Sequence, residues 1–341
     1  MVLRGLLDSP VDQSANVALL ARIERNLCED TTDTCSSLAS SSFSYAAASR
    51  ELWSLVLDVV FAPLWLRVRA ADLLRRCSEH AMDADEIVKV RMQEKLKLRA
   101  IVSSTCQALE ELDAKDALQS AQLFTWLGFL ETVLVATESA VWAHVFQNTM
   151  YGSMLTKMLR LLSICATEVF AALTMCLALF HAHEKQGGRS ILVGEMLREM
   201  KEGREHLSGA LLHVINSCGY PCPTERVLHL WNVLELFGDI LADEVATALV
   251  YLNDFKLLVD LVIRECTDLP LEDVTRFQYV KLLERSLESP LYLQAQRYRK
   301  KEVLRLLESL LKTGVEEDSI MPQEVVDGIK HILVRHINVL D

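Results

Sequence analysis

LVYLNDFKLLVDLVIRECTDL, residues Leu249 to Leu269, predicts a helix that is buried on most of its sides. Its apolar side chains recur at helical spacing and cover a wide face: Phe255, Leu257, Leu258, Val259, Leu261, Val262 and Ile263. Only a narrow polar strip interrupts them, formed by Lys256, Asp260 and Arg264 at intervals of four. A helix that is apolar over most of its circumference packs between neighbouring helices. The segment therefore predicts a stack of helices from which one polar strip reaches the surface or a groove.

The polar residues of this segment have a structural and a functional interpretation. Asn253 is expected to cap the helix by accepting backbone N–H bonds, and Asp254 falls in the positive first turn. Asp260 can pair with the cations one turn to either side, Lys256 and Arg264, for roughly 0.2–0.5 kcal/mol per pair. The strip either only solvates the helix or contacts a partner, and both interpretations stay open.

Helical patterns of this kind fill most of the chain. Only 12 Gly and 7 Pro punctuate it, so long elements with short connections are expected. The predicted helices are Tyr45 to Phe61, Leu64 to Cys77, Asp83 to Leu112, Ala117 to Val135, Glu138 to Gln147, Gly152 to Ile164, Thr167 to His181, Ile191 to Met200, Glu205 to Ser217, Glu225 to Ile240, Asn253 to Thr267, Leu271 to Glu288, Tyr298 to Lys312 and Pro322 to Val339. No alternating strand pattern appears among them. The fold class is therefore all-α.

Helices in series with short breaks are typical of an armadillo- or HEAT-like α-solenoid whose repeats have become degenerate. A globular helical bundle is the alternative, but a single core stops growing near this chain length. The last predicted helix has one apolar face, as the end of a stack requires. We expect an N-terminal helix in residues 1–27, a flexible Ser- and Thr-rich loop in 28–44, and an armadillo-like helical domain in 45–341.

Composition excludes several classes of function. The net charge of −12 opposes nucleic-acid binding, which needs a basic surface. The most apolar run, Val169 to Phe180, is too short for a bilayer, which takes about 20 apolar residues. No secretory signal is visible at the start of the chain. The nine scattered cysteines are typical of reduced, buried thiols in a cytoplasmic protein.

Motifs of catalysis and of cofactor binding are missing from the sequence, which predicts a protein that is not an enzyme and needs no cofactor. Two weak metal patterns remain. One is His181, His183 and Glu184, at a helix end where His is favoured by the helix dipole anyway. The other is Cys218 and Cys222, flanked by His213 and His229, which are interpreted more simply as thiols in a turn. The prediction is therefore that no metal site is present, and a metal-dependent module built on Cys218 and Cys222 stays open as an alternative.

Two basic clusters stand out against the acidic background. The first comprises Lys89, Arg91, Lys95, Lys97 and Arg99 on the long predicted helix. The second comprises Arg297, Arg299, Lys300, Lys301 and Arg305. Such runs are commonly solvated helix faces whose long stems cover apolar surface. Alternatively they form a docking site for an acidic protein surface, and the second cluster is the stronger candidate.

The same C-terminal region resembles a known family. LWNVLELFGD (Leu230 to Asp239), the segment around Tyr251 to Arg264, and SPLYLQAQRYRKKEVLRLLESLL (Ser289 to Leu311) are similar to the leucine-rich domain of the WISH/DIP/SPIN proteins. The positions that carry the family pattern are Tyr251, Asn253, Asp254, Asp260, Arg264, Pro290, Tyr292 and Arg297. The resemblance covers residues 228–311. The resemblance implies the compact fungal form of the family, because the sequence shows no match to the SH3 domain and proline-rich region of the animal members.

The resemblance implies an armadillo-repeat fold and activation of the Arp2/3 (actin-related protein 2/3) complex without a preformed filament. The product would be a linear, unbranched actin filament. The protein would act in the cytoplasm, at the cortical actin cytoskeleton, and would take part in endocytosis. The Arp2/3 complex would be the partner, with actin engaged indirectly. The expected partner-binding residues are Asn253, Asp254, Lys256, Asp260, Arg264, Tyr292, Arg297, Arg299, Lys300 and Lys301. The alternative is a scaffold that binds a helix or peptide of another protein.

Overall fold

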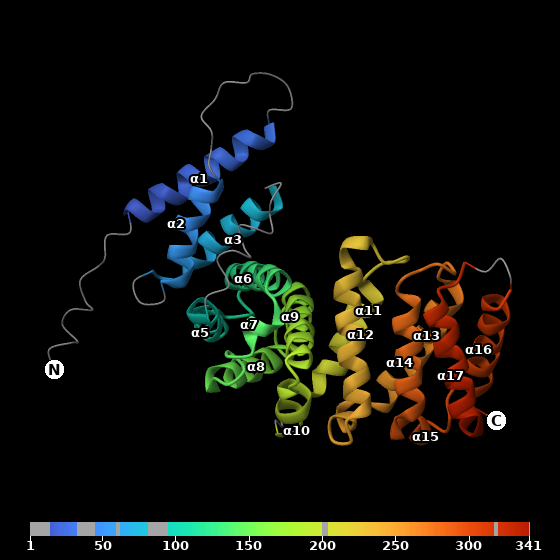
Figure 1. Cartoon of the computed structure of the whole chain (residues 1–341). Helices are drawn as coiled ribbons and strands as arrows, with labels where there is room; N and C mark the ends of the chain where they lie inside the picture. Colours follow the sequence, from blue (N-terminus) through green and yellow to red (C-terminus); the bar gives the residue numbers. More distant parts are fainter. Residues whose placement is uncertain are drawn as a thin grey trace. The chain divides into compact units, whose positions relative to one another are not determined.

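All regular elements in the described part of the protein are helices, as Figure 1 shows. The computed structural model describes residues 14–32, 45–58, 62–80, 95–199, 204–316 and 320–340, and these contain no strand. The all-α, solenoid-like fold class predicted from the sequence is confirmed. None of the described helices is both long and apolar enough to cross a bilayer. Contacts along the chain group it into two compact units, residues 1–154 and 155–341.

The first unit is built around two large indole rings and a buried cation. Its helices are α1 (Ser14–Thr32), α2 (Tyr45–Leu57), α3 (Leu64–His80), α5 (Lys95–Glu111), α6 (Ala117–Ala136) and α7 (Ser139–Trp142), after which α8 (Thr149–Leu161) begins. Helix α3 packs against α1, α2 and α6, and α5 packs against α2, α6 and α7. Trp126 and Trp142 are fully buried. The buried Arg67 donates hydrogen bonds to the carbonyl of Ala62 and to the side chains of Ser104 and Gln107 on α5. These bonds offset the cost of burying its charge.

Several N-terminal predictions need adjustment. Helix α1 continues to Thr32, so the first residues of the loop predicted for 28–44 are helical, while 33–44 lie outside the described residues. The long helix predicted from Asp83 is described only from Lys95, so Lys89 and Arg91 of the first basic cluster also lie outside. The prediction of one helical domain over 45–341 stays a prediction.

The second unit is a regular stack of helices. They are α9 (Thr167–Gln186), α10 (Leu197–Glu199), α11 (Leu207–Ser217), α12 (Val227–Ala242), α13 (Leu252–Asp268), α14 (Arg276–Glu288), α15 (Pro290–Gln294), α16 (Lys300–Gly314) and α17 (Gln323–Leu340). Short π or 3-10 turns precede some of them: η1 (Leu192–Met196), η2 (Arg204–His206), η3 (Thr224–Arg226) and η4 (Ala246–Leu249).

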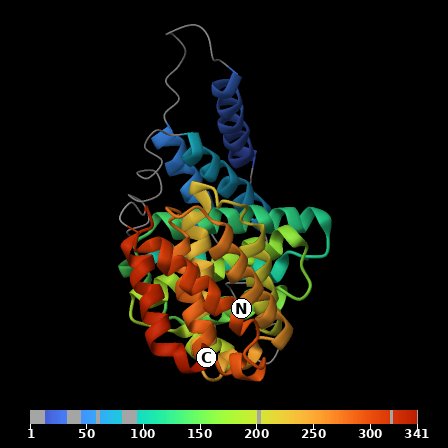
Figure 2. The ribbon, with the colours of Figure 1, turned by 90° about the vertical axis from the view of Figure 1, so that its right-hand side faces the viewer.

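These helices form two rows. In one row α12 packs against both α9 and α14, and α14 packs against α17. In the other row α13 packs against both α11 and α16. The rows contact each other through the pairs α11 with α12, α13 with α14 and α16 with α17. Figure 1 shows these pairs as successive layers, and Figure 2 looks along the stack from its C-terminal end. Two rows of helices stacked layer on layer are the defining geometry of a solenoid.

Helix α13 occupies the middle of its row, as its composition predicts. Phe255, Leu258 and Val262 are fully buried, while the opposite side carries polar residues. Its last turn is closed by a residue of the next helix, because buried Arg276 donates hydrogen bonds to the carbonyls of Cys266, Leu269 and Pro270. The final carbonyls of a helix have no partner within the helix, so such a side chain completes its end.

The close approach of the last two long helices depends on a glycine. A Cβ added at Gly314, where α16 ends, would lie 2.8 Å from Cγ2 of Val326 and 3.1 Å from Sδ of Met321. We expect Gly314→Ala to lower the free energy of unfolding by about 1–3 kcal/mol, because the crowded neighbours must shift. Urea unfolding followed by circular dichroism measures the change.

A matched control lies in the same unit. A Cβ added at Gly209 in α11 meets nothing within 4 Å. Gly209→Ala should therefore stabilise the protein by up to about 1 kcal/mol, since alanine favours the helix over the unfolded chain. Equal effects of the two substitutions would contradict the packing argument.

Candidate functional site

The polar strip predicted on α13 lies at the surface of the second unit. Asn253 and Arg264 are exposed, and Asp260 and Lys256 are half-buried between them. Leu257, which the sequence assigned to the apolar face, is 58% exposed and lies in the middle of the strip. We refer to these five residues as the α13 strip. The strip therefore combines one exposed apolar side chain with charged groups on the same face of α13.

Asp260 makes its contacts across the stack and not along its own helix. Its Oδ1 accepts a 3.0 Å hydrogen bond from Nε of Arg299, and its Oδ2 accepts a 3.1 Å bond from the hydroxyl of Tyr298. The ammonium of Lys256 lies 5.7 Å from the centre of the Tyr298 ring, within cation–π range. The prediction that Asp260 pairs with Lys256 and Arg264 of its own helix is therefore corrected. A nearer cation, Arg299, comes from the segment that leads into α16.

Arg264 and Asn253, at the two ends of the α13 strip, have other roles than the sequence predicts. Arg264 donates to Oε1 of Glu265 at 2.7 Å and to Oδ1 of Asn216 in α11 at 3.3 Å. Asn253 is not the cap of α13, because the helix already begins at Leu252 and Tyr251 occupies the cap position. Asp254 lies in the first turn, as expected, and accepts a 2.8 Å hydrogen bond from Ser208 of α11.

Tyr292 belongs to the core and not to the contact surface, which corrects its assignment. Its side chain is 0% exposed, and burial raises the pKa of its hydroxyl to about 12. Its carbonyl accepts a 2.9 Å hydrogen bond from the amide of Arg297. Tyr292 therefore holds the start of the connection between α15 and α16 from within the core.

That connection holds an unusual run of backbone conformations. Gln296, Arg297 and Arg299 have φ angles of 57°, 54° and 57°, in the left-handed region that residues with a Cβ rarely adopt. Strained backbone of this kind persists where the surrounding structure fixes it, and it clusters at functional sites. Here it directs Tyr298 and Arg299 back onto α13.

The same connection presents a concentrated positive charge. Arg297, Arg299 and Lys301 are exposed, and Lys300 is half-buried. We call residues 297–301 the basic turn. Hydrogen bonds with Tyr298 and Asp260 raise the pKa of the Arg299 guanidinium. The α13 strip and the basic turn, joined through Asp260, thus form one continuous candidate surface in an otherwise acidic chain.

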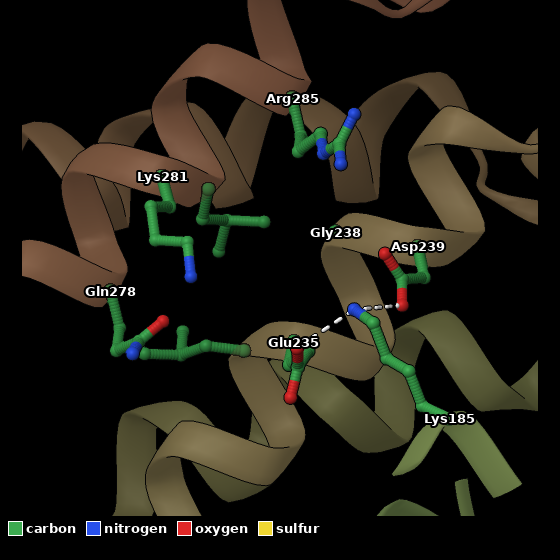
Figure 3. Close-up of a pocket in the computed structure, with 9 residues that line it drawn as sticks. Lys185, Glu235, Gly238, Asp239, Gln278, Lys281 and Arg285 are labelled. Carbon is green, nitrogen blue, oxygen red and sulfur yellow. Dashed lines mark hydrogen bonds and ion pairs between the residues drawn. The ribbon is translucent and has the colours of Figure 1, made fainter. Parts of the chain in front are cut away.

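The structure reveals a second candidate region that the sequence did not indicate. A cleft of about 120 Å³ opens in the other row of helices, between α9, α12 and α14. Lys185 donates a 2.7 Å hydrogen bond to Glu235 and another of 2.7 Å to Asp239, both on α12. Figure 3 shows Lys185 directed at these two carboxylates. Gln278, Lys281 and Arg285 of α14 face them across the cleft. The only sequence signal was the spacing of Glu235 and Asp239, one turn apart on α12.

Asp239 makes the stability of this region depend on pH. Burial alone would raise the pKa of its carboxyl, but hydrogen bonds with His181 and Lys185 outweigh burial and hold the pKa below its usual value. A lowered pKa contributes stability that is present above about pH 4 and is lost as the pH falls through the folded-state value. We expect Asp239→Asn to lose less stability than the wild type between about pH 5 and about pH 3. Urea unfolding at both pH values tests this, and an unchanged pH dependence would contradict it.

The two weak metal patterns have structural roles. His181 Nε2 lies 3.0 Å from Asp239, and the fully buried Glu184 accepts the amides of Ile191 and Leu192. Cys218 and Cys222 share a hydrogen bond, and burial raises the pKa of Cys222 to about 11, which disfavours the thiolate that metals bind.

The flanking histidines do not complete a ligand set around these thiols. The ring of His213 packs edge-on against Phe170, at a distance of 5.9 Å between centroids. Within the described part of the chain, neither cysteine joins a cluster of three ligands.

Comparison with known proteins identifies the segment that carries both candidate regions. Residues 165–303 match the family model described as the SPIN90/Ldb17 leucine-rich domain, which confirms the resemblance drawn from the sequence. No curated protein matches the chain. The matched segment runs from the start of α9 into α16 and contains the α13 strip and the basic turn. The match supports a scaffold-type domain rather than an enzyme family, and a role related to actin regulation or endocytosis.

Proposed function

We propose that this protein binds and activates the Arp2/3 complex without a preformed filament and so seeds linear, unbranched actin filaments. The family match supports a protein that acts on actin through protein contacts. The proposal places its action at the cortical actin cytoskeleton. It requires no catalytic residue, because the effect is on the shape of the partner.

The single observation that carries the proposal is the continuous surface of α13 and the basic turn within the matched segment. Three features of this surface favour binding of a protein partner. Leu257 supplies apolar area, the basic turn supplies charge of one sign, and the pair of Asp260 with Arg299 fixes the register between them. A partner surface that is acidic and carries an apolar groove fits this arrangement.

Activation needs a difference in affinity between two states of the Arp2/3 complex. A ligand that binds both states equally shifts nothing, however tightly it binds. To move a complex from about 1% active to about 99% active, the protein must bind the active arrangement about 10⁴-fold more tightly. An extended solenoid face suits this role, because it contacts several points of a large partner at once.

Polymerisation of pyrene-labelled actin with purified Arp2/3 complex and no added filaments tests the proposal. Saturating amounts of the protein are expected to shorten the lag before polymerisation. The same amounts without the Arp2/3 complex should leave the lag unchanged. A lag that stays the same in the presence of the complex would rule the proposal out.

The cleft between α9, α12 and α14 favours a second candidate function, a scaffold for a helix or peptide of another protein. Glu235 and Asp239 line one side, where Lys185 pairs with both, and Lys281 and Arg285 line the other. This function predicts a bound peptide and no effect on actin. Loss of binding in Lys281→Glu, with unchanged actin nucleation, would support it over the first proposal.

A further inference from the structure

The junction between α14 and α17 holds a cluster of ionisable side chains outside both candidate regions. Glu284 and Glu288 lie one turn apart on α14, and His336 approaches them from α17. One donor atom from each of the three residues lies within 4.8 Å of the other two. The two helices are neighbours in the same row of the stack, as Figures 1 and 2 show.

His336 is the unusual member of this cluster. It is 7% exposed, and its Nε2 atom is buried without a hydrogen-bond partner among the described residues. That nitrogen lies 3.8 Å from Oε1 of Glu288 and 3.9 Å from Oε1 of Glu284. A buried polar atom without a partner is costly, so its position toward two carboxylates calls for an explanation.

We propose that Glu284, Glu288 and His336 form a binding site for a divalent transition-metal cation of the zinc class, which fastens α17 to α14. Zinc binds carboxylate oxygen and imidazole nitrogen at about 2.0–2.2 Å, which puts tetrahedral ligands about 3.4 Å apart. The separations of 3.8 Å and 3.9 Å between His336 and the two glutamates therefore need to close by about half an ångström, and the third pair of donor atoms lies within 4.8 Å. Mixed nitrogen and oxygen donors favour zinc over calcium, which takes six to eight oxygen ligands.

The donor atoms of the three residues agree with this role. An imidazole nitrogen and two carboxylate oxygens are among the ligands that zinc takes in proteins.

Three side chains compete with a metal for the carboxylates. Nη1 of Arg335 lies 2.9 Å from Oε1 of Glu288, Nη1 of Arg285 lies 3.4 Å from Oε2 of Glu288, and Nδ1 of His331 lies 2.7 Å from Oε1 of Glu284. All three side chains are about half exposed or more, so each can move into solvent when a dication enters. The simpler explanation is that these side chains alone pair with the glutamates, and it makes different predictions.

Calorimetric titration of the chelator-stripped full chain with Zn²⁺ tests the proposal. We expect one equivalent to bind and the thermal midpoint to rise by roughly 5 °C at zinc well above its dissociation constant. The double variant Glu284→Gln/Glu288→Gln and the single variant His336→Gln should each lose this uptake. The surface variant Glu308→Gln on α16 is the control and should bind as the wild type does.

Two further measurements separate this site from the alternatives. Cobalt substitution should give no thiolate-to-metal charge-transfer band, which a site at the cysteines would show. Arg335→Ala should bind zinc several-fold more tightly, because a competing cation is removed. No stoichiometric uptake, uptake that survives the glutamine variants, a thiolate band, or weaker binding by Arg335→Ala would each overturn the proposal.

Discussion

Arg276→Met is expected to lower the free energy of unfolding of the protein by about 4 kcal/mol. The guanidinium is 0% exposed and donates to three carbonyls at the end of α13, with a distance of 3.0 Å to that of Pro270. Methionine fills a similar volume but donates no hydrogen bond. The substitution therefore leaves buried carbonyls without partners at the point where α13 turns into α14.

Thermal and urea unfolding of the variant measure this loss. Arg285→Met is the matched control, because Arg285 lies on the same helix and is about half exposed. Its effect should stay within about 0.5 kcal/mol, as for most surface substitutions. A loss of less than about 1 kcal/mol in Arg276→Met would show that the carbonyls find other partners, and the account of this helix end would be wrong.

Reversing the charge of the basic turn is expected to weaken binding of the Arp2/3 complex at least about 100-fold. The triple variant Arg297→Glu/Lys300→Glu/Lys301→Glu places three acidic groups where the proposed partner surface is acidic. Like charges at an interface repel and slow association as well as weakening the complex. Affinity is measured by fluorescence anisotropy of the labelled complex, at low and at physiological salt.

The control for this variant changes the net charge by the same amount at sites outside the basic turn. Lys115→Glu/Arg160→Glu/Arg189→Glu replaces three exposed cations outside the basic turn. It should bind nearly as the wild type does, and circular dichroism should show that both triple variants are folded. Equal loss in the two variants would mean that net charge, and not the basic turn, governs binding.

The helices of the second unit were largely predictable from the sequence. The helix predicted from Asn253 to Thr267 is observed as Leu252–Asp268, and that predicted from Pro322 to Val339 as Gln323–Leu340. Both carry a strong apolar periodicity that a stacked helix must bury. The start of α14 was placed too early, because residues 271–275 form turns before the helix begins.

The candidate site was predictable only in part. The sequence identified Lys256, Asp260 and Arg264 as a surface strip, since their spacing follows from one helix alone. It could not show that Asp260 pairs with Arg299, which lies 39 positions further along the chain. It also could not show that Tyr292 is buried, because a tyrosine next to a basic helix suits an interface as well as a core. Such contacts depend on how two helices pack, which local periodicity does not specify.

The cleft and the cluster at the α14–α17 junction were missed for the same reason. Each joins residues from different helices, such as Lys185 with Glu235 and Glu284 with His336. No spacing within a single helix brings such pairs together. Only the i, i+4 pairs within them, Glu235 with Asp239 and Glu284 with Glu288, are visible in the sequence.

Single-filament fluorescence microscopy tests the central proposal most directly. Labelled actin monomers, purified Arp2/3 complex and this protein are mixed without preformed filaments, and new filaments are counted and classed as linear or branched. The account predicts many more linear filaments than with the Arp2/3 complex alone, and none of the increase when the basic turn is reversed in charge. A filament count equal to that of the complex alone, or an increase made of branches, would contradict it.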